Sequence, residues 1–158
     1  MSWSFIGFFW LFIAFCLKIV LDEIFWPWKK REAKRKGIDC NNLGKAAGGI
    51  FLSGVIIHPL IEECVFRLPV LLLFLGDGVN LISFQIVCIL ALIFSLVHIS
   101  NGGVYKLVSV NINLFLGGLI YGFLALKTNN ILWPILLHMI YNGYSHSQRK
   151  KLKKRVSD

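Results

Sequence analysis

The chain of 158 residues lacks several features that would place it in common classes of protein. None of its four cysteines belongs to a CxxC pair, which argues against a disulfide framework and against a zinc knuckle. It has no HExxH motif, the helical zinc-binding pattern of many metallopeptidases. It shows no internal inverted repeat of the kind that transporters carry. No folded basic domain accompanies its 17 lysines and arginines, so nucleic-acid binding is not expected.

Apolar residues, in contrast, are abundant. They make up 56% of the chain, and the mean hydropathy is +0.69, more than a soluble domain of this length can bury. Crossing a bilayer takes about 20 helical residues, and helices satisfy their own backbone hydrogen bonds in lipid. We therefore predict an all-α, polytopic helical membrane protein with about five spanning helices and no soluble appendage. The apolar runs cover residues 3–20, 50–75, 81–99, 107–126 and 131–144.

The first run is expected to be a retained membrane helix. No positive charge precedes it, and no small-residue cleavage site is evident, so it does not resemble a signal peptide. The predicted organisation is an N-terminal helix with a basic cytoplasmic loop over residues 1–36, a core over residues 44–146, and a basic cytoplasmic tail over residues 147–158.

The positive charge predicts the topology. Six of the 17 lysines and arginines lie in residues 29–36 and six in residues 149–155. The positive-inside rule places both basic segments in the cytoplasm, where anionic lipid head groups would meet them. The chain between them must then cross an even number of times, and four crossings fit if residues 50–75 form one segment bent near Pro59. This predicts a multi-pass integral protein of the cell (inner or plasma) membrane.

Small residues predict a close helix contact. Gly118 and Gly122 form a GxxxG pattern, a spacing that lets helix backbones approach closely. We interpret it as packing within the bundle. The same face could also serve a dimer, and the oligomeric state stays open.

The most informative residues are two adjacent acids, Glu62 and Glu63, inside the second apolar run. A charged side chain in the membrane centre costs roughly 2.5–3.5 kcal/mol on insertion scales, so such residues indicate a functional site. Arg67 lies four residues after Glu63, on the same helical face, and is expected to form an ion pair with it.

Glu62 needs a different partner, because it is rotated by about 100° from Glu63 around a helix of 3.6 residues per turn. The candidates are His98 on the third apolar run and His138 with Asn142, which share a face on the fifth run. Counting 1.5 Å per residue from the predicted edges places all four side chains at compatible depths, in a band that is open to the cytoplasmic half. We therefore predict a polar cavity that opens to the cytoplasmic side.

Three ordered motifs resemble those of one family: EExxxR over residues 62–67, FxxxH over residues 94–98 and HxxxN over residues 138–142. The chain resembles the CAAX-protease and bacteriocin-processing (CPBP/Abi) family of glutamate-type intramembrane endopeptidases. The Gly-rich approach to the third motif, with its turn at Thr128, Asn129 and Asn130, is also similar to that family.

The resemblance implies a role for each motif residue. Glu62 would activate a water molecule that attacks the peptide carbonyl, with His98 sharing or relaying the proton. His138 and Asn142 would stabilise the oxyanion, and Glu63 and Arg67 would support the site. The expected partners are a membrane-associated peptide or protein substrate and the lipid bilayer, in a bacterial processing or sorting role.

Two sets of alternatives remain. A glutamate and two histidines could bind zinc, but a neutral asparagine is a poor zinc ligand, so we expect neither metal nor other cofactor and favour the metal-free mechanism. The same fold could also serve as a non-catalytic membrane immunity or peptide-binding protein. A small proton-coupled transporter is a third possibility.

Overall fold

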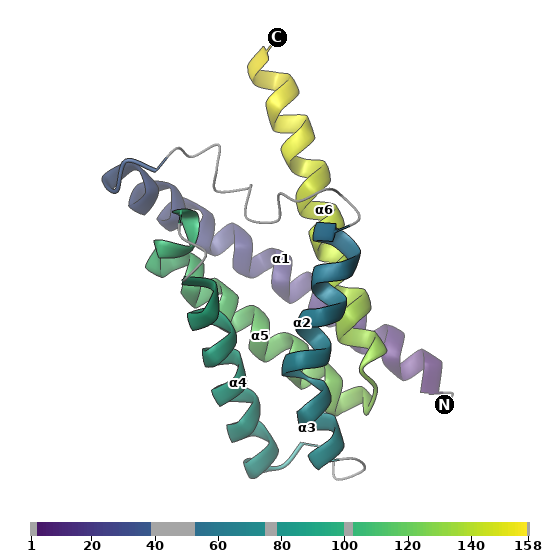
Figure 1. Cartoon of the computed structure of the whole chain (residues 1–158). Coiled ribbons are helices and arrows are strands. Elements are labelled where there is room, and N and C mark those ends of the chain that lie inside the picture. The colour runs from purple at the N-terminus through teal and green to yellow at the C-terminus, as the bar shows by residue number, and fades with distance from the viewer. Residues whose placement is uncertain (1–2, 39–52, 75–78, 100–102, 158) are drawn as a thin grey trace.

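The computed structural model describes residues 3–38, 53–74, 79–99 and 103–157, and these parts contain helices and no strand, as predicted. The elements in Figure 1 follow one another along the chain. They are α1 (Trp3–Arg35), the π-helix η3 (Ser53–Ile57), α2 (His58–Phe66), α3 (Leu68–Leu73), α4 (Leu81–Ile99), the 3₁₀-helix η4 (Gly103–Lys106), α5 (Val108–Thr128) and α6 (Leu132–Ser157).

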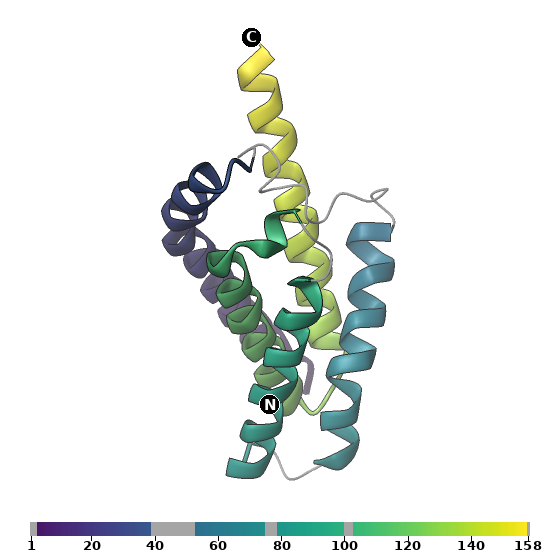
Figure 2. The same ribbon diagram turned by 60° about the vertical axis from the view of Figure 1, so that its left-hand side comes forward.

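Three of the described helices are long and apolar enough to cross a membrane: most of α1, all of α4 and all of α5. Helix α4 coincides with the predicted run over residues 81–99. The other two apolar runs form the shorter helices α2 and α3 and the first half of α6. In Figures 1 and 2 the chain runs alternately up and down the bundle, so the C-terminal ends of α1 and α6 lie at the same end. This arrangement agrees with the parity argument, while the membrane side of that end stays a prediction.

The second apolar run is broken twice. The π-helix η3 leads directly into α2 with Ile57 in helical conformation, and Pro59 in the first turn of α2 has no N–H to donate to the preceding π-helical turn. The expected irregularity near Pro59 is therefore a change of helix type. A second break at Arg67 (φ −116°, ψ −32°) separates α2 from α3, and Pro69 stands in the first turn of α3. Sequence analysis did not predict this second break, although Pro69 was its visible signal.

The two basic segments are more helical than predicted. Residues 29–36 were expected to be a loop, but α1 continues through Arg35, and the basic tail is helical through Ser157 in α6. Lysine, arginine and glutamate are good helix formers, so a run of charge need not end a helix. An ion pair of 3.2 Å between Lys36 Nζ and Glu32 Oε1, four residues apart, adds to this stability.

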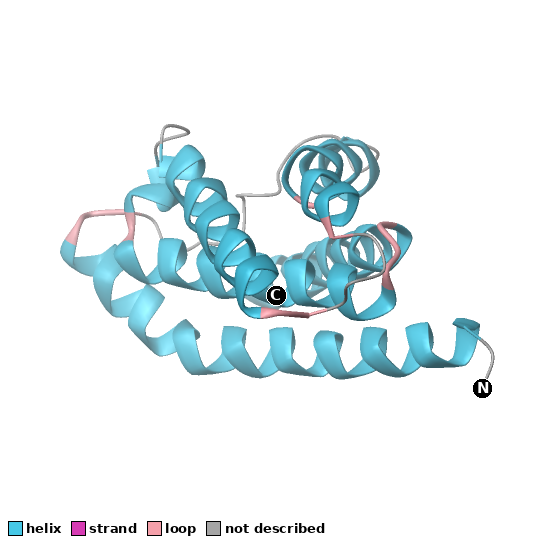
Figure 3. Ribbon diagram, turned by 90° about the horizontal axis from the view of Figure 1, so that it is seen from below, coloured by secondary structure: helices cyan, strands magenta, loops and turns pink. Residues whose placement is uncertain are grey.

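Helix α5 is the centre of the bundle and contacts α1, α4 and α6. Figure 3 shows α1, which starts at the N-terminus, lying along one side of the other helices. The contact with α4 depends on the predicted GxxxG pattern, because a Cβ atom on Gly118 would lie 3.0 Å from Ala91 Cβ and 3.2 Å from Ala91 Cα. The interpretation of this pattern as packing within the bundle is thus confirmed.

Helix α1 is joined to α5 by buried polar contacts at two levels. Lys18 Nζ donates a hydrogen bond of 2.9 Å to Asn113 Oδ1, and Asp22 accepts hydrogen bonds from Asn113 and Lys29. At the end of α1, Glu32 accepts hydrogen bonds from the backbone N–H groups of Val108 (2.8 Å) and Ser109 (2.9 Å). Glu32 thus caps the first turn of α5, whose own N-cap residue provides no side-chain hydrogen bond.

Candidate active site

Three of the predicted site residues converge from three helices. Glu62 comes from α2, His98 from the last turn of α4 and His138 from α6. Glu62 Oε1 lies 3.7 Å from His98 Nε2, and Glu62 Oε2 lies 3.7 Å from His138 Nε2. Both distances exceed that of a direct hydrogen bond, so each carboxylate oxygen can accept one from another molecule.

The predicted pair of Glu63 and Arg67 is present. Arg67 Nε lies 3.4 Å from Glu63 Oε2, and the two side chains are 2% and 0% exposed. Their geometry does not make a hydrogen bond, and the Arg67 guanidinium has no hydrogen-bond acceptor among the described residues. It lies instead over the Phe94 ring, 5.3 Å from the ring centre. This buried pair is held by charge and by cation–π contact.

Glu63 also orients His138. Its Oε1 lies 2.9 Å from His138 Nδ1. A carboxylate accepts hydrogen bonds, so Nδ1 carries the hydrogen and Nε2 is turned toward Glu62. The two adjacent acids therefore differ in their relation to His138: Glu63 orients the imidazole ring, and Glu62 faces its Nε2.

His98 is oriented by its own helix. Its Nδ1 donates to the carbonyl oxygen of Phe94, four residues earlier, over 2.8 Å. The ring also contacts the rings of Phe94 and Tyr105, at 4.5 and 5.3 Å between centres. These contacts leave Nε2 facing Glu62, so the FxxxH spacing places both the ring and its orienting carbonyl.

Asn142 does not join this cluster directly. It lies one turn after His138 in α6, and its Nδ2 donates a hydrogen bond of 3.0 Å to the carbonyl oxygen of Gly54 in η3. No hydrogen bond joins Asn142 to Glu62 among the described residues. A carboxamide has two N–H donors, so this hydrogen bond leaves the second one for another acceptor. Its catalytic role stays a prediction.

Tyr121 was missed by sequence analysis. It is 3% exposed in α5, and its ring stacks on His138 with 4.9 Å between centres and 20° between planes. It is a positioning residue for His138, because stacking restricts rotation of the imidazole. Its position between Gly118 and Gly122 was an available signal: small neighbours bring a helix close enough for one large ring to reach across.

Whether this site could bind a metal ion depends on which side chains are available as ligands. In the described part of the chain, no group of three or more histidine, cysteine, aspartate or glutamate side chains has the arrangement of a metal site. Glu62, His98 and His138 remain the side chains that zinc would have to use. Metal dependence is therefore a matter for experiment.

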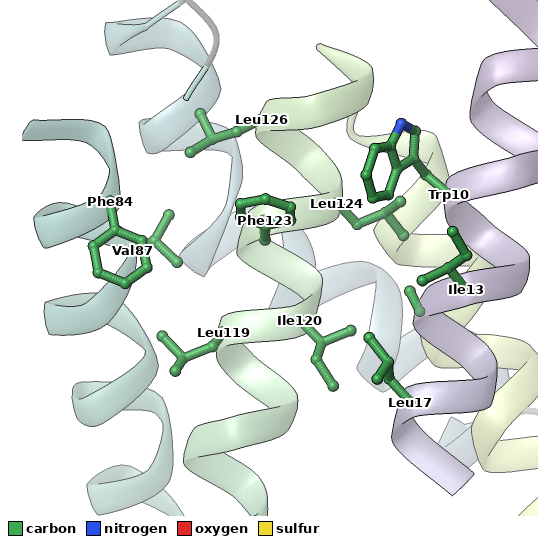
Figure 4. A pocket seen from close by; sticks show the side chains of 11 residues that line it. Trp10, Ile13, Leu17, Phe84, Val87, Leu119, Ile120, Phe123, Leu124 and Leu126 are labelled. Carbon is green, nitrogen blue, oxygen red and sulfur yellow. The ribbon is translucent and has the colours of Figure 1, made fainter. Parts of the chain in front are cut away.

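The apolar pocket in Figure 4 is lined by none of these residues. It has a volume of about 230 Å³ and lies between α1, α4 and α5. Its lining includes Trp10, Phe84 and Phe123 and contains no charged side chain. This pocket is not the predicted polar cavity, which stays a prediction.

An acid–histidine cluster within a bundle of apolar helices is the arrangement expected of an intramembrane hydrolase. The comparison with protein families agrees: the model described as type II CAAX prenyl endopeptidase Rce1-like matches residues 46–144. The match covers more than half of the chain and includes all three motifs, so the chain belongs to this family of CAAX-type membrane proteases. No curated protein and no solved structure matches the chain.

Proposed function

We propose that this protein is an intramembrane endopeptidase that hydrolyses a peptide bond near the terminus of a membrane-associated substrate, with a water molecule activated by Glu62 and His98. The observation that carries the proposal is the position of the Glu62 carboxylate between two imidazole nitrogens, 3.7 Å from each.

The orientation of His98 supports a role in binding the water. Because its Nδ1 hydrogen is donated to Phe94, Nε2 of the neutral ring is an acceptor that faces a second acceptor, Glu62. A water molecule could donate one O–H to each of them. Its oxygen lone pair would then be free to attack a carbonyl carbon, with Glu62 taking the proton as general base.

On the other side of the Glu62 carboxylate, the position of His138 supports a role in stabilising the negative charge of the intermediate. His138 lies between Glu62 and Glu63, and in the proposed mechanism its ring carries, besides the hydrogen on Nδ1, one on Nε2. That N–H and the second N–H of Asn142 would donate to the oxyanion of the tetrahedral intermediate. Collapse of this intermediate breaks the C–N bond, and the proton taken from water passes to the leaving amine.

Replacing Glu62 by glutamine tests the proposal. Glu62→Gln should lower kcat/KM by about 10²–10⁴-fold, because it removes the general base. The assay uses the full chain in detergent micelles with a farnesylated CAAX-type peptide and its unprenylated counterpart, since the family description names prenyl endopeptidases. Thermal unfolding should show that the variant remains folded.

The matched control is Glu23→Gln, the same chemical change at an exposed position of α1. It should leave cleavage unchanged. Full activity of Glu62→Gln would end the proposal. Binding of the peptide without cleavage by the wild-type chain would favour a non-catalytic peptide-binding protein.

Chelation tests the metal-free form of the mechanism. We expect activity to survive exhaustive treatment with EDTA and o-phenanthroline, with a zinc peptidase inactivated in parallel. Loss of activity that returns on addition of Zn²⁺ would instead assign Glu62, His98 and His138 as metal ligands.

A further inference from the structure

The last turns of α1 carry cations on two faces that differ in their partners. On the inner face, Lys29 Nζ lies 3.0 Å from Asp22 Oδ1, and Lys36 Nζ lies 3.2 Å from Glu32 Oε1. Each of these lysines, Lys36 standing just after the helix, is thus neutralised by an acid of α1. They are parts of the contact between α1 and α5.

The outer face holds three further cations and an aromatic ring that together line one hollow: Trp28, Arg31, Lys34 and Arg35. Arg31, Lys34 and Arg35 are exposed, and none of them has an acidic partner among the described residues. Their spacing of three, six and seven residues after Trp28 puts them on one side of the helix. The hollow therefore presents concentrated positive charge without a counter-charge from the protein.

The place of this hollow along α1 fits the membrane surface. At 1.5 Å per residue, the 33 residues of α1 span about 50 Å, whereas the hydrocarbon core is about 30 Å thick. The excess falls at the C-terminal end, because the apolar residues lie before Trp26. Figure 1 shows α1 crossing the bundle obliquely, so its length exceeds the depth that it crosses. Tryptophans such as Trp26 and Trp28 are typical of the head-group level.

We propose that Trp28, Arg31, Lys34 and Arg35 form a binding site for the phosphate of an anionic phospholipid. Two guanidinium groups and one ammonium group can each donate hydrogen bonds to phosphate oxygens, and arginine does so through two parallel N–H groups. The Trp28 ring is stacked against Phe25, with 5.7 Å between centres, and so forms a fixed apolar wall beside the charges. Neither an uncharged lipid nor a zwitterionic one would neutralise the three cations.

Lipid titration of the full chain in dodecyl maltoside micelles tests the site. The unfolding temperature is followed as palmitoyl-oleoyl phosphatidylglycerol, the corresponding phosphatidylcholine, or inorganic phosphate is added, since a bound ligand stabilises the folded state. We expect phosphatidylglycerol to raise the unfolding temperature at much lower concentration than phosphatidylcholine. Inorganic phosphate should not reproduce the rise.

The decisive variant is Arg31→Gln/Lys34→Gln/Arg35→Gln. Each cation near a membrane surface contributes about a fivefold change in binding, so the half-saturating phosphatidylglycerol concentration should increase on the order of a hundredfold. The charge-matched control is Lys150→Gln/Lys151→Gln/Lys153→Gln in the basic end of α6, which removes the same charge elsewhere. It should change the response far less than the α1 variant does.

A second variant keeps the charge and tests the geometry. Arg31→Lys/Arg35→Lys should weaken the response several-fold, because lysine does not donate two parallel hydrogen bonds. It also provides the test if the triple variant does not fold. Three results would overturn the proposal: equal responses to both lipids, an equal loss in the α6 control, or the full temperature rise with inorganic phosphate alone, which would indicate a site for free phosphate.

Discussion

Two buried polar clusters in this bundle use similar side chains in different ways. The first joins α1 to α5 through Lys18, Asp22 and Asn113, and the second joins α2, α4 and α6 around Glu62 and Glu63. In the first cluster, Lys18 contacts both Asn113 and Asp22 and lies 4.6 Å from the centre of the Tyr141 ring. In the second cluster, Glu62 is 3.7 Å from each of its histidines.

The difference lies in unused hydrogen-bonding capacity. Of the five buried side-chain atoms that lack a protein hydrogen-bond partner in the described part of the chain, four belong to Glu63 and Arg67 and none to the first cluster. A buried polar group without a partner destabilises a protein, so a fold that serves stability alone would satisfy it. The first cluster has the properties of a structural contact, whereas the second keeps buried polar atoms that no described group satisfies, which is typical of functional sites.

The largest expected effect comes from removing the charge of Arg67. Arg67→Met leaves the fully buried Glu63 without its counter-charge, which should lower the free energy of unfolding by about 3–5 kcal/mol. Thermal unfolding in detergent micelles measures this loss. Unchanged stability would show that the ion pair does not hold α2.

A double variant separates stability from function at the same place. Glu63→Gln/Arg67→Met removes both charges and should recover part of the lost stability. Cleavage should stay low, because a neutral glutamine does not hold the Nδ1 hydrogen of His138 as a carboxylate does. Recovery of cleavage together with stability would make the Glu63 charge dispensable for the site.

A smaller effect on stability, without a catalytic one, is expected from the first cluster. Asp22→Asn keeps the shape of the side chain but leaves Lys18 and Lys29 without an anion. The free energy of unfolding should fall by about 1–3 kcal/mol, less than for Arg67 because the Asp22 side chain is 27% exposed. The kcat of the folded fraction should be unchanged. Lys30→Gln, an exposed change in the same helix, is the control and should have almost no effect.

The smallest effect is expected where α4 approaches α5. Gly118→Ala would place a Cβ atom 3.0 Å from Ala91 and 3.4 Å from Arg67 Nη2, so the helices must separate slightly. We expect a loss of about 1 kcal/mol in the free energy of unfolding, at the low end of overpacking effects. Gly143→Ala is the comparison, because its nearest neighbour, Val55 Cγ1, would be 3.9 Å away. Equal stability of the two variants would contradict the close approach.

The features that could be predicted from the sequence depend on residues that are close together in the chain, or on the need for apolar helices and paired charges within a lipid bilayer. The limits of α4 followed from a continuous apolar run, and the pair of Glu63 and Arg67 followed from a spacing of four residues. The convergence of Glu62, His98 and His138 could be expected because few other groups were able to offset a buried acid.

The missed features depend on contacts between distant segments. Lys18 and Asp22 stand at the end of the first apolar run, but only the position of α5 reveals Asn113 as their partner. Asn142 shares the predicted helix with His138, yet its hydrogen bond goes to Gly54, a backbone group that no side-chain pattern indicates. The basic end of α1 was read as a loop because charge alone does not distinguish an exposed helix from an irregular segment.

The cap that Glu32 places on α5 has a consequence for how the chain is assembled. Glu32 is translated 76 residues before Val108, whose backbone N–H donates a hydrogen bond to the Glu32 carboxylate. During synthesis, α1 therefore enters the membrane long before α5 has been translated. Until then, Lys36 is the nearby cation that can form an ion pair with Glu32. Docking of α1 must wait until α5 has been translated, which makes this contact a late, long-range step in biogenesis.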